Sequence, residues 1–366
     1  MQGISATKIG LFNAIGFAWT AKVLWAPAVD LWGTYRRWIQ LALIFLIATI
    51  ALLGIVPPAG MAFWIVASIL AIASATQDIA IDALTIRMTP AGLLGPVNSA
   101  RVVAFRAAII VTGGGIAAIA DWLGWRGAFF AAAGITVALL LFTFTLPRVE
   151  QLAGWHENPF RALGRWLARP HAITMLVVIL LYRMGDSALT PMIPKYWAIR
   201  GYSATEIGTV TSTLGMICTI AGAIAGGMFV ARFGVYKGLL WLGFLQMASN
   251  IGYALIATTD GPRAAMYAAA VIETFCNGLG TAAFLSFLMA ICDKENAATE
   301  FAMLSAVFAL SRTIAGMVSG IGADQLGFAA YFWVTIALGI PGLLLLPAIR
   351  DRLSVTAPTQ QSTVEI

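Results

Sequence analysis

Long apolar segments follow one another along almost the whole chain, and they restrict the possible folds more than any motif does. Each is about 18 to 28 residues long, the length that an α-helix needs to cross roughly 30 Å of hydrocarbon, whereas strands of a membrane barrel alternate over about ten residues. Only 10% of the residues are charged, against about 25% in a soluble domain. We therefore predict an all-α polytopic membrane protein. Its eleven predicted spans are residues 9–29, 38–56, 61–84, 102–120, 127–146, 171–193, 205–230, 238–258, 264–291, 302–322 and 328–349.

The longest polar interruption divides these spans into two groups. It runs from Pro147 to Pro170 and carries four arginines and two tryptophans, a composition that favours a partly amphipathic cytoplasmic linker. We predict an N-terminal bundle at residues 1–146, the linker at 147–170, a C-terminal six-helix bundle at 171–349 and a cytoplasmic tail at 350–366.

The placement of lysine and arginine predicts the orientation in the membrane. If the loop after the first span is cytoplasmic, 13 of the 22 Lys and Arg residues lie on the inner side and five on the outer side. Cytoplasmic loops tend to carry such an excess of positive charge. The C-terminus is then cytoplasmic. We attribute the net charge of +6 to loops that face an anionic lipid leaflet, and not to nucleic-acid binding.

The chain contains an internal repeat with a period of about two hundred residues. Residues 5–10 (SATKIG) recur as 203–208 (SATEIG), and residues 29–36 (VDLWGTYR) recur as 230–237 (VARFGVYK). Both copies keep the same loop polarity, so we predict parallel repeats and a carrier built from two bundles of six helices. The helix at 171–193 has no counterpart before residue 5. We therefore expect that the first helix is missing here because the start codon was assigned too late.

Two carboxylates lie one helical turn apart inside the third apolar segment. Asp78 and Asp82 share a helix face, and the amide of Gln77 lies beside them. Each ionised Asp in a span costs roughly 2.5 to 3.5 kcal/mol, so we expect this face to line a hydrated internal surface. A proton carrier must change charge, and His156 and His171 lie in the linker or at its edge. We therefore predict Asp82 first, and Asp78 second, as proton-coupling residues.

Several stretches resemble the AmpG-type muropeptide permeases. They are residues 22–30 (KVLWAPAVD), 75–83 (ATQDIAIDA), 182–186 (YRMGD), 277–284 (NGLGTAAF) and 299–306 (TEFAMLSA) with Arg312. These permeases belong to the major facilitator superfamily, in a branch that also holds acetyl-coenzyme A transporters. The resemblance implies proton-driven import of anhydro-muropeptides across the inner membrane, for peptidoglycan recycling. The alternatives are transport of another bulky anion, such as acetyl-coenzyme A, and a sensor built on the same fold that does not transport.

Charged residues within the spans are the first candidates for substrate binding. Arg106 and Arg312 occupy matching places in the two repeats, which would set them facing each other. A guanidinium group binds a carboxylate or phosphate through two parallel hydrogen bonds, so such a pair suits an anion. The alternative is that each arginine neutralises a nearby acid, for example Asp78 or Glu273, because ionisable groups at this depth seek partners.

The remaining candidates are polar residues that also have structural explanations. Lys22 lies three residues from two tryptophans, where it either supplies charge beside aromatic faces or extends to the membrane interface. The polar groups of Gln77, Glu273 and Asn277 suit hydroxyl and amide groups, although they also suit bridges between helices. The complete predicted substrate-binding set is Gln77, Lys22, Arg106, Arg183, Glu273, Asn277 and Arg312.

Two further predictions concern coupling and gating. Asp186 stands one turn from Arg183, which favours a local ion pair, with a role in proton coupling as the alternative. The loop after the first span resembles the short cytoplasmic turn that serves as a gate in major facilitators. There we expect Asp30, paired with Arg36 or Arg37, to latch the two halves in the outward-open state. The alternative is that these arginines only follow the positive-inside rule.

Other kinds of chemistry find little support in the sequence. The three cysteines are scattered, with neither a disulfide framework nor a zinc-binding spacing. There is no phosphate-binding loop ending in Gly-Lys-Ser/Thr, so ATP does not drive the protein directly. A membrane-embedded enzyme would need a nucleophile with its base, or clustered metal ligands. We therefore predict a transporter that is not an enzyme, needs no cofactor or metal, and works as a monomer on a small anionic solute and protons.

Overall fold

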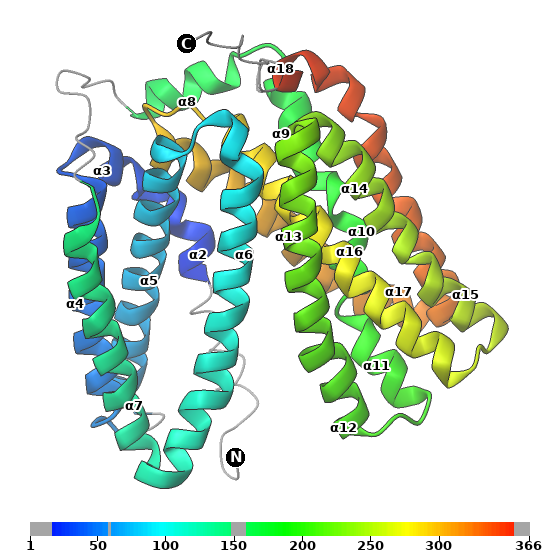
Figure 1. Ribbon diagram of the computed structural model, residues 1–366, viewed down its shortest axis with the longest axis horizontal. Helices are drawn as coiled ribbons and strands as arrows, with labels where there is room; N and C mark the ends of the chain where they lie inside the picture. Colours follow the sequence, from blue (N-terminus) through cyan, green and yellow to red (C-terminus); the bar gives the residue numbers. More distant parts are fainter. Residues whose placement is uncertain (1–16, 58–59, 148–158, 355–366) are drawn as a thin grey trace, which may run out of the picture. The chain divides into compact units, whose positions relative to one another are not determined.

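The computed structural model describes residues 17–57, 60–147 and 159–354. All regular secondary structure in this part of the chain is helical, and nine helical segments are long and apolar enough to cross a membrane (Figure 1). The prediction of an all-α polytopic membrane protein is thereby confirmed. The predicted first span, 9–29, lies partly outside the described residues. Its described part forms α2 (Phe17–Ala21), a 3-10 turn (Lys22–Leu24) and α3 (Ala26–Leu31).

Contacts divide the chain into two compact units. Unit 1 comprises Met1–Met88, Ala107–Trp166 and Cys292–Ala306, and unit 2 comprises Thr89–Arg106, Leu167–Ile291 and Val307–Ile366. Each unit thus takes one short segment from the other predicted half of the sequence. The domain boundaries that we derived from the sequence stay a prediction.

Unit 1 is built on three long helices. These are α4 (Tyr35–Leu53), α5 (Met61–Met88) and α7 (Ile116–Phe142), and α4 packs against both of the others (Figure 1). The hydroxyl group of Thr34 caps α4 by accepting a hydrogen bond from the backbone N–H of Arg37 at 3.3 Å. The packing face of α4 buries Ile39, Leu43 and Leu46. A further short helix, α8 (Pro159–Leu167), lies within the predicted linker.

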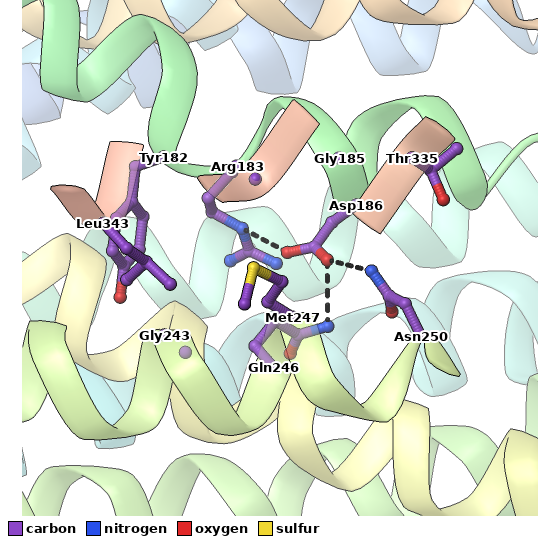
Figure 2. A pocket seen from close by; sticks show the side chains of 12 residues that line it. Tyr182, Arg183, Gly185, Asp186, Gly243, Gln246, Met247, Asn250, Thr335 and Leu343 are labelled. Atoms are coloured by element: carbon purple, nitrogen blue, oxygen red, sulfur yellow. Dashed lines mark hydrogen bonds and ion pairs between the residues drawn. The ribbon is translucent and has the colours of Figure 1, made fainter. Parts of the chain in front are cut away.

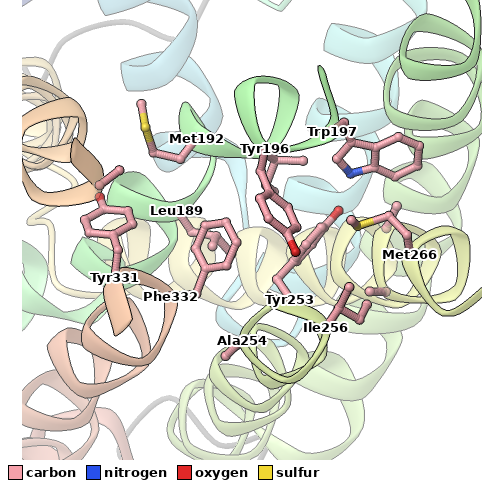
Figure 3. Packing of buried hydrophobic residues seen from close by; sticks show 14 of the residues in the cluster. Leu189, Met192, Tyr196, Trp197, Tyr253, Ala254, Ile256, Met266, Tyr331 and Phe332 are labelled. Carbon is pink, nitrogen blue, oxygen red and sulfur yellow. The ribbon is translucent and has the colours of Figure 1, made fainter. Parts of the chain in front are cut away.

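Unit 2 contains a larger set of helices and helical fragments. In chain order they are α6 (Leu94–Ile110, with its last residues in unit 1), α9 (Ala172–Tyr182), α10 (Met184–Leu189), α11 (Met192–Ile199), α12 (Ala204–Ile207), α13 (Gly215–Phe233), α14 (Val235–Ser249), α15 (Ile251–Thr259), α16 (Arg263–Ala290), α17 (Ala297–Leu344, which begins in unit 1) and α18 (Arg350–Ser354). A core of buried aromatic and aliphatic side chains, among them Leu189, Trp197, Tyr253 and Phe332, holds α11, α15, α16 and α17 together (Figure 3).

Two helix boundaries differ from those expected from hydropathy. Residues 85–101 were expected to form a cytoplasmic loop, but α5 continues to Met88 and α6 begins at Leu94, because backbone hydrogen bonds extend a helix beyond its apolar stretch. The predicted continuous span 171–193 is broken at Arg183, which has φ −112° and ψ 13°, and again before Pro191, which lacks a backbone donor.

The internal repeat is visible in the backbone. Gly33 and Gly234 occupy matching positions in the repeated loop, and both have a positive φ, 75° and 84°. Residues 121–124 (DWLG) and 324–327 (DQLG) match as well, and the glycines that end them, Gly124 and Gly327, have φ values of 68° and 73°. Glycine adopts this region without steric cost. Helices α7 and α17 each break at this glycine, and in α17 the break falls between the predicted spans 302–322 and 328–349.

Glycines bring α13 and α16 into close contact. A Cβ atom at Gly222 would overlap the carbonyl oxygen of Phe275, and one at Gly226 would lie 2.7 Å from the carbonyl oxygen of Leu279. On the facing helix, a Cβ atom at Gly278 would overlap the carbonyl oxygen of Thr219. Small residues are common where membrane helices approach each other this closely.

This contact predicts the effect of a single methyl group. Gly222→Ala should force α13 and α16 apart and destabilise the protein by about 1–3 kcal/mol, measured as a lower midpoint of thermal unfolding in detergent. Gly316→Ala in α17 is the matched control, because an added Cβ there meets nothing within 4 Å and alanine favours a helix by about 1 kcal/mol. Equal midpoints for the two variants would contradict the close contact.

Candidate functional site

A buried lysine lies between the two carboxylates of α5 in unit 1. Lys22 Nζ donates a hydrogen bond to Asp78 Oδ2 at 2.7 Å and lies 4.0 Å from Asp82 Oδ2. Lys22 is 4% exposed and Asp82 3%, whereas the side chain of Asp78 is 42% exposed. The structure thus joins one predicted substrate-binding residue to both predicted proton-coupling residues.

Local structure explains how these three groups meet. Asp78 and Asp82 lie four residues apart in α5, so both project from one face of the helix. Lys22 begins the 3-10 turn between α2 and α3, and nearby the indole N–H of Trp25 donates to Thr76 Oγ1 of α5 at 3.1 Å. The alternative that Lys22 extends toward the membrane interface is wrong, because its ammonium group is buried against the two carboxylates.

A second charged network lies in unit 2, where the apolar segment from α9 to α10 is broken. Arg183 occupies the break, and its Nε atom lies 3.6 Å from Asp186 Oδ2 in the predicted ion pair. Asp186 Oδ1 accepts hydrogen bonds from Gln246 Nε2 at 3.3 Å and from Asn250 Nδ2 at 3.0 Å. Figure 2 shows the carboxylate of Asp186 between the guanidinium group and the two amides. Three donors therefore compensate the charge of this buried acid.

Helix α16 adds a second acid to the same network. Glu273 is 5% exposed and makes side-chain hydrogen bonds with Asn277 and Gln246. One turn further on, Thr281 Oγ1 accepts a hydrogen bond from Arg183 Nη1 at 2.6 Å, and the same hydroxyl donates to the backbone oxygen of Asn277 at 2.6 Å. The network therefore connects α9, α10, α14 and α16.

Two more arginines interact electrostatically with Arg183. Arg106 of α6 interacts with Arg183 and with Glu273, and its buried Nε atom has no hydrogen-bond partner among the described residues. Arg312 of α17 also interacts with Arg183, and its guanidinium group lies 5.8 Å from the centre of the Phe308 ring. Three guanidinium groups and two carboxylates leave this region with one net positive charge. Such a region suits an anion.

A small cavity lies beside Asp186. It measures about 10 Å³ and is lined by the polar side chains of Arg183, Asp186, Gln246 and Asn250 together with glycines of α10, α14, α16 and α17. This volume holds about one water molecule. The carbonyl oxygens of Gln246 and Asn250 are buried and have no hydrogen-bond partner in the described part of the chain. Two acceptors of the network therefore lack donors among the described residues.

The predicted gate residue Asp30 caps a helix. Its carboxylate accepts hydrogen bonds from the backbone N–H groups of Ala298 and Thr299 at 3.1 and 2.7 Å, from the Thr299 hydroxyl at 2.6 Å and from the Tyr35 hydroxyl at 2.9 Å. Ala298 and Thr299 lie in the first turn of α17, where unpaired N–H groups and the helix dipole attract negative charge. Burial raises the pKa of the Asp30 carboxyl group, and these hydrogen bonds oppose the increase.

The expected pairing of Asp30 with Arg36 or Arg37 is wrong. Both oxygens of Asp30 are already occupied by donors from α17 and Tyr35. Arg36 instead donates to the backbone oxygen of Leu146 at 3.0 Å and lies over the ring of Phe144, while Arg37 is exposed. Among the described residues, Arg37 and the half-buried Gln77 join neither charged network.

Three members of the unit 2 network, Gln246, Asn250 and Thr281, were not predicted from the sequence. Gln246 and Asn250 are polar residues four apart in an otherwise apolar segment, and that spacing places both on one helix face. The same spacing did identify Asp78 and Asp82, so the signal was available. Thr281 carries no such signal, because threonine is common in membrane helices and often bonds to its own backbone.

Known proteins share both the sequence and the fold of this chain. The Major Facilitator Superfamily profile matches residues 2–299 and also 175–365. The anhydromuropeptide permease of Escherichia coli K12 is 34% identical over 370 residues, which cover 97% of this chain and 75% of the permease. The predicted resemblance to muropeptide permeases is thereby confirmed.

Solved structures agree with the fold at low sequence identity. A variant of the E. coli fucose:proton symporter FucP matches with a TM-score of 0.72 and 16% identity, over 97% of this chain and 92% of that one. The human organic anion transporter MFSD10 also matches with a TM-score of 0.72, at 17% identity over 91% of this chain and 82% of that one. At these identities the likeness shows the fold alone.

The helix cap at Asp30 predicts a measurable loss of stability. Asp30→Ala removes the carboxylate that accepts all four hydrogen bonds from the first turn of α17 and from Tyr35. Loss of a helix cap typically costs about 0.5–2 kcal/mol. We expect a lower midpoint of thermal unfolding in detergent at neutral pH. Asp121→Ala serves as the control, because Asp121 is exposed on α7. A midpoint for Asp30→Ala as high as that of the control would be incompatible with the cap.

Proposed function

The chain belongs to the major facilitator superfamily, and from this premise we propose that it imports anhydro-muropeptides into the cytoplasm with protons. It is a multi-pass membrane protein with the fold of secondary transporters, and its relatives are transporters and not enzymes. The observation that carries the substrate is the 34% identity to a protein named anhydromuropeptide permease along 97% of this chain. Recycling of peptidoglycan fragments would then be its physiological role.

Proton coupling rests on the cluster of Lys22, Asp78 and Asp82. One ammonium and two carboxylates leave these three groups with one net negative charge, which a single proton neutralises. A low-dielectric site favours that neutral state. Asp82 is the more buried acid and lies farther from Lys22, so it is the first candidate for the proton, while Asp78 keeps the direct bond to Lys22. Alternating access would expose this cluster to each side of the membrane in turn.

Substrate binding rests on the positive region of unit 2. Anhydro-muropeptides carry carboxylates on their peptide part, and arginine binds a carboxylate through two parallel hydrogen bonds. Arg106 is the strongest candidate because its Nε atom is buried without a hydrogen-bond partner in the described residues. Arg183 and Arg312 supply further positive charge, and Asn277 and Gln77 are candidates for contacts with hydroxyl and amide groups of the sugar and peptide.

Gating rests on the cap of α17 by Asp30. By sequence Asp30 belongs to the first predicted bundle and Thr299 to the second, so their hydrogen bonds connect the two predicted halves. A transporter that alternates between two states needs contacts that form in one state and break in the other. We assign this cap to the state closed toward the cytoplasm. Arg36 and Arg37 would hold the turn next to Asp30 in place in that state.

The proposed location is the inner membrane, with the C-terminus in the cytoplasm and the protein acting as a monomer. The excess of Lys and Arg in the loops assigned to the inner side supports this orientation. A cysteine introduced at Thr359, close to the C-terminus, should react with an impermeant thiol reagent only in inside-out vesicles. The cysteine is introduced into a protein whose own three cysteines are replaced, and the same assay on that parent protein measures the background labelling.

The substrate is tested by direct uptake. Vesicles that contain the protein should accumulate labelled anhydro-muropeptide when the outside is acidic, and a protonophore should abolish the accumulation. Labelled acetyl-coenzyme A is the comparison substrate, because it is also a bulky anion. Uptake of acetyl-coenzyme A in place of the muropeptide would reassign the substrate, and uptake that ignores the pH gradient would reject proton coupling.

Asp82→Asn is expected to separate coupling from transport. It removes the titrating carboxyl group but keeps the size of the side chain, so accumulation driven by a pH gradient should be lost. Exchange of internal for external substrate, which needs no net proton movement, should continue. Asp121→Asn is the control, because Asp121 is an exposed acid outside both networks. Normal gradient-driven accumulation by Asp82→Asn would remove this residue from the coupling mechanism.

Arg106→Lys is expected to weaken substrate binding and leave coupling intact. Lysine keeps the charge but cannot form the two parallel bonds of a guanidinium group, so we expect KM to rise by about tenfold, equivalent to about 1.4 kcal/mol. The matched control is Arg126→Lys, since Arg126 is exposed, lies over the ring of Phe130 and belongs to neither charged network. An unchanged KM in Arg106→Lys would exclude a two-bond contact with the substrate.

A further inference from the structure

We propose that Glu273 is a second proton-binding residue, located in unit 2 and distinct from the cluster of Lys22, Asp78 and Asp82. It was expected from the sequence to bind substrate. Its link to transport rests on the proposed function, but its protonation can be tested on the isolated protein. The proposal follows from the burial of Glu273, from the hydrogen bonds available to it and from the charges that surround it.

The burial of Glu273 makes an uncompensated charge costly. It is 5% exposed in the middle of α16. The guanidinium group of Arg183, which interacts with it electrostatically, pairs with Asp186 and donates a hydrogen bond to Thr281. In the described part of the chain, the hydrogen-bonding groups beside Glu273 are the side-chain amides of Asn277 and Gln246. A buried carboxylate without its own ion pair is unfavourable, and the binding of a proton removes that cost.

The hydrogen-bond inventory also favours a proton on Glu273. Gln246 lies between the two acids, and its Nε2 atom donates to Asp186 Oδ1 at 3.3 Å. Its carbonyl oxygen is buried and has no donor among the described residues, and the residue as a whole is 4% exposed. An ionised Glu273 only adds acceptors, whereas a protonated Glu273 adds one O–H donor next to this amide. A protonated Glu273 therefore supplies a donor next to an amide oxygen that lacks one, whereas an ionised Glu273 adds further acceptors.

The titratable and charged groups that interact with Glu273 come from several helices. Arg106 of α6 and Arg183 between α9 and α10 are the cations, and Asp186 of α10 is the other anion. Tyr253 of α15 and Cys276 of α16 are the remaining titratable neighbours. Helix α13 presents the neutral surface of Gly215, Thr219 and Gly222 to this part of α16.

This arrangement couples proton binding to anion binding. With Glu273 ionised, the three arginines and two acids, Arg106, Arg183, Arg312, Asp186 and Glu273, carry one net positive charge, and a proton on Glu273 increases it to two. The proton also releases Arg106 from its attraction to Glu273, so that its guanidinium group is available to an anionic substrate. By reciprocity, a bound anion makes Glu273 hold its proton more tightly. Proton and substrate would then load together on the acidic side and leave together on the alkaline side.

The protonated state can be observed directly in the purified protein. A protonated carboxyl group gives a C=O stretching band in the infrared spectrum that a carboxylate lacks. In an Asp82→Asn background, which removes the other proposed proton-binding acid, we expect a pH-dependent band of this kind to be lost in Glu273→Gln and retained in Glu206→Gln, the control, because Glu206 bonds to Ser203 and Arg263 outside the network. A band that persists in Glu273→Gln would overturn the proposal.

Isotope labelling gives the same answer without a mutation. In wild-type protein grown with ¹³C-glutamate a pH-dependent component of the band should shift, and ¹³C-aspartate should shift only the component that belongs to Asp82. This measurement decides the question even if Glu273→Gln fails to fold. A shift with labelled aspartate alone would assign the proton to an aspartate such as Asp186 and reject Glu273.

Substrate binding tests the coupling separately. Wild-type protein should bind anhydro-muropeptide up to about tenfold more weakly for each unit of pH increase across the titration of Glu273, and it should take up protons from a weakly buffered solution on binding. In Glu273→Gln the pH dependence should be flat and one proton fewer should be taken up. If wild-type protein binds no muropeptide, the proposed function fails while the infrared result still stands. A pH dependence unchanged by Glu273→Gln would reject the coupling.

Discussion

The need to neutralise charge inside an apolar bundle governs both candidate sites. An ionised side chain at this depth is costly unless another charge or several hydrogen bonds compensate it. In unit 1 a single lysine serves two aspartates, Asp78 and Asp82. In unit 2 Asp186 is compensated by Arg183 and two amides, while Glu273 has amides only. The proposed coupling of protons to an anion depends on how these buried charges are compensated.

Backbone irregularities and close helix contacts place these charges. The break at Arg183 interrupts the helix, so that its guanidinium group reaches both Asp186 and Thr281 on α16. Glycines such as Gly222 let α13 approach α16 at backbone distance, and this holds the helix that carries Glu273 rigidly in the core. Rigid helices keep the charged groups at defined separations, which matters because electrostatic energy changes steeply with distance in an apolar medium.

The sequence predicted many of the charged residues of both sites but few of their contacts. A spacing of four residues identified Asp78 and Asp82, and a spacing of three identified the pair of Arg183 and Asp186. Partners on one helix turn can be recognised in this way from nearby positions in the sequence. The partner of Asp30 was missed, since the first turn of α17 lies about 270 residues away in the chain and an unpaired backbone N–H group has no residue signature. Gln246 and Asn250 were missed although they show the same spacing as the two aspartates.

The sequence by itself determined the class of protein, the approximate helices, the parallel repeat and the likeness to muropeptide permeases. These properties depend on local hydropathy, on spacing within one helix and on similarity along the chain, all of which can be read from neighbouring residues. Only the tertiary structure decided which charge meets which. Lys22 and Asp78 are 56 residues apart, and Arg183 and Thr281 are 98, so their contacts depend on how whole helices pack. That packing also decided which acid is compensated by an ion pair and which is compensated by amides alone.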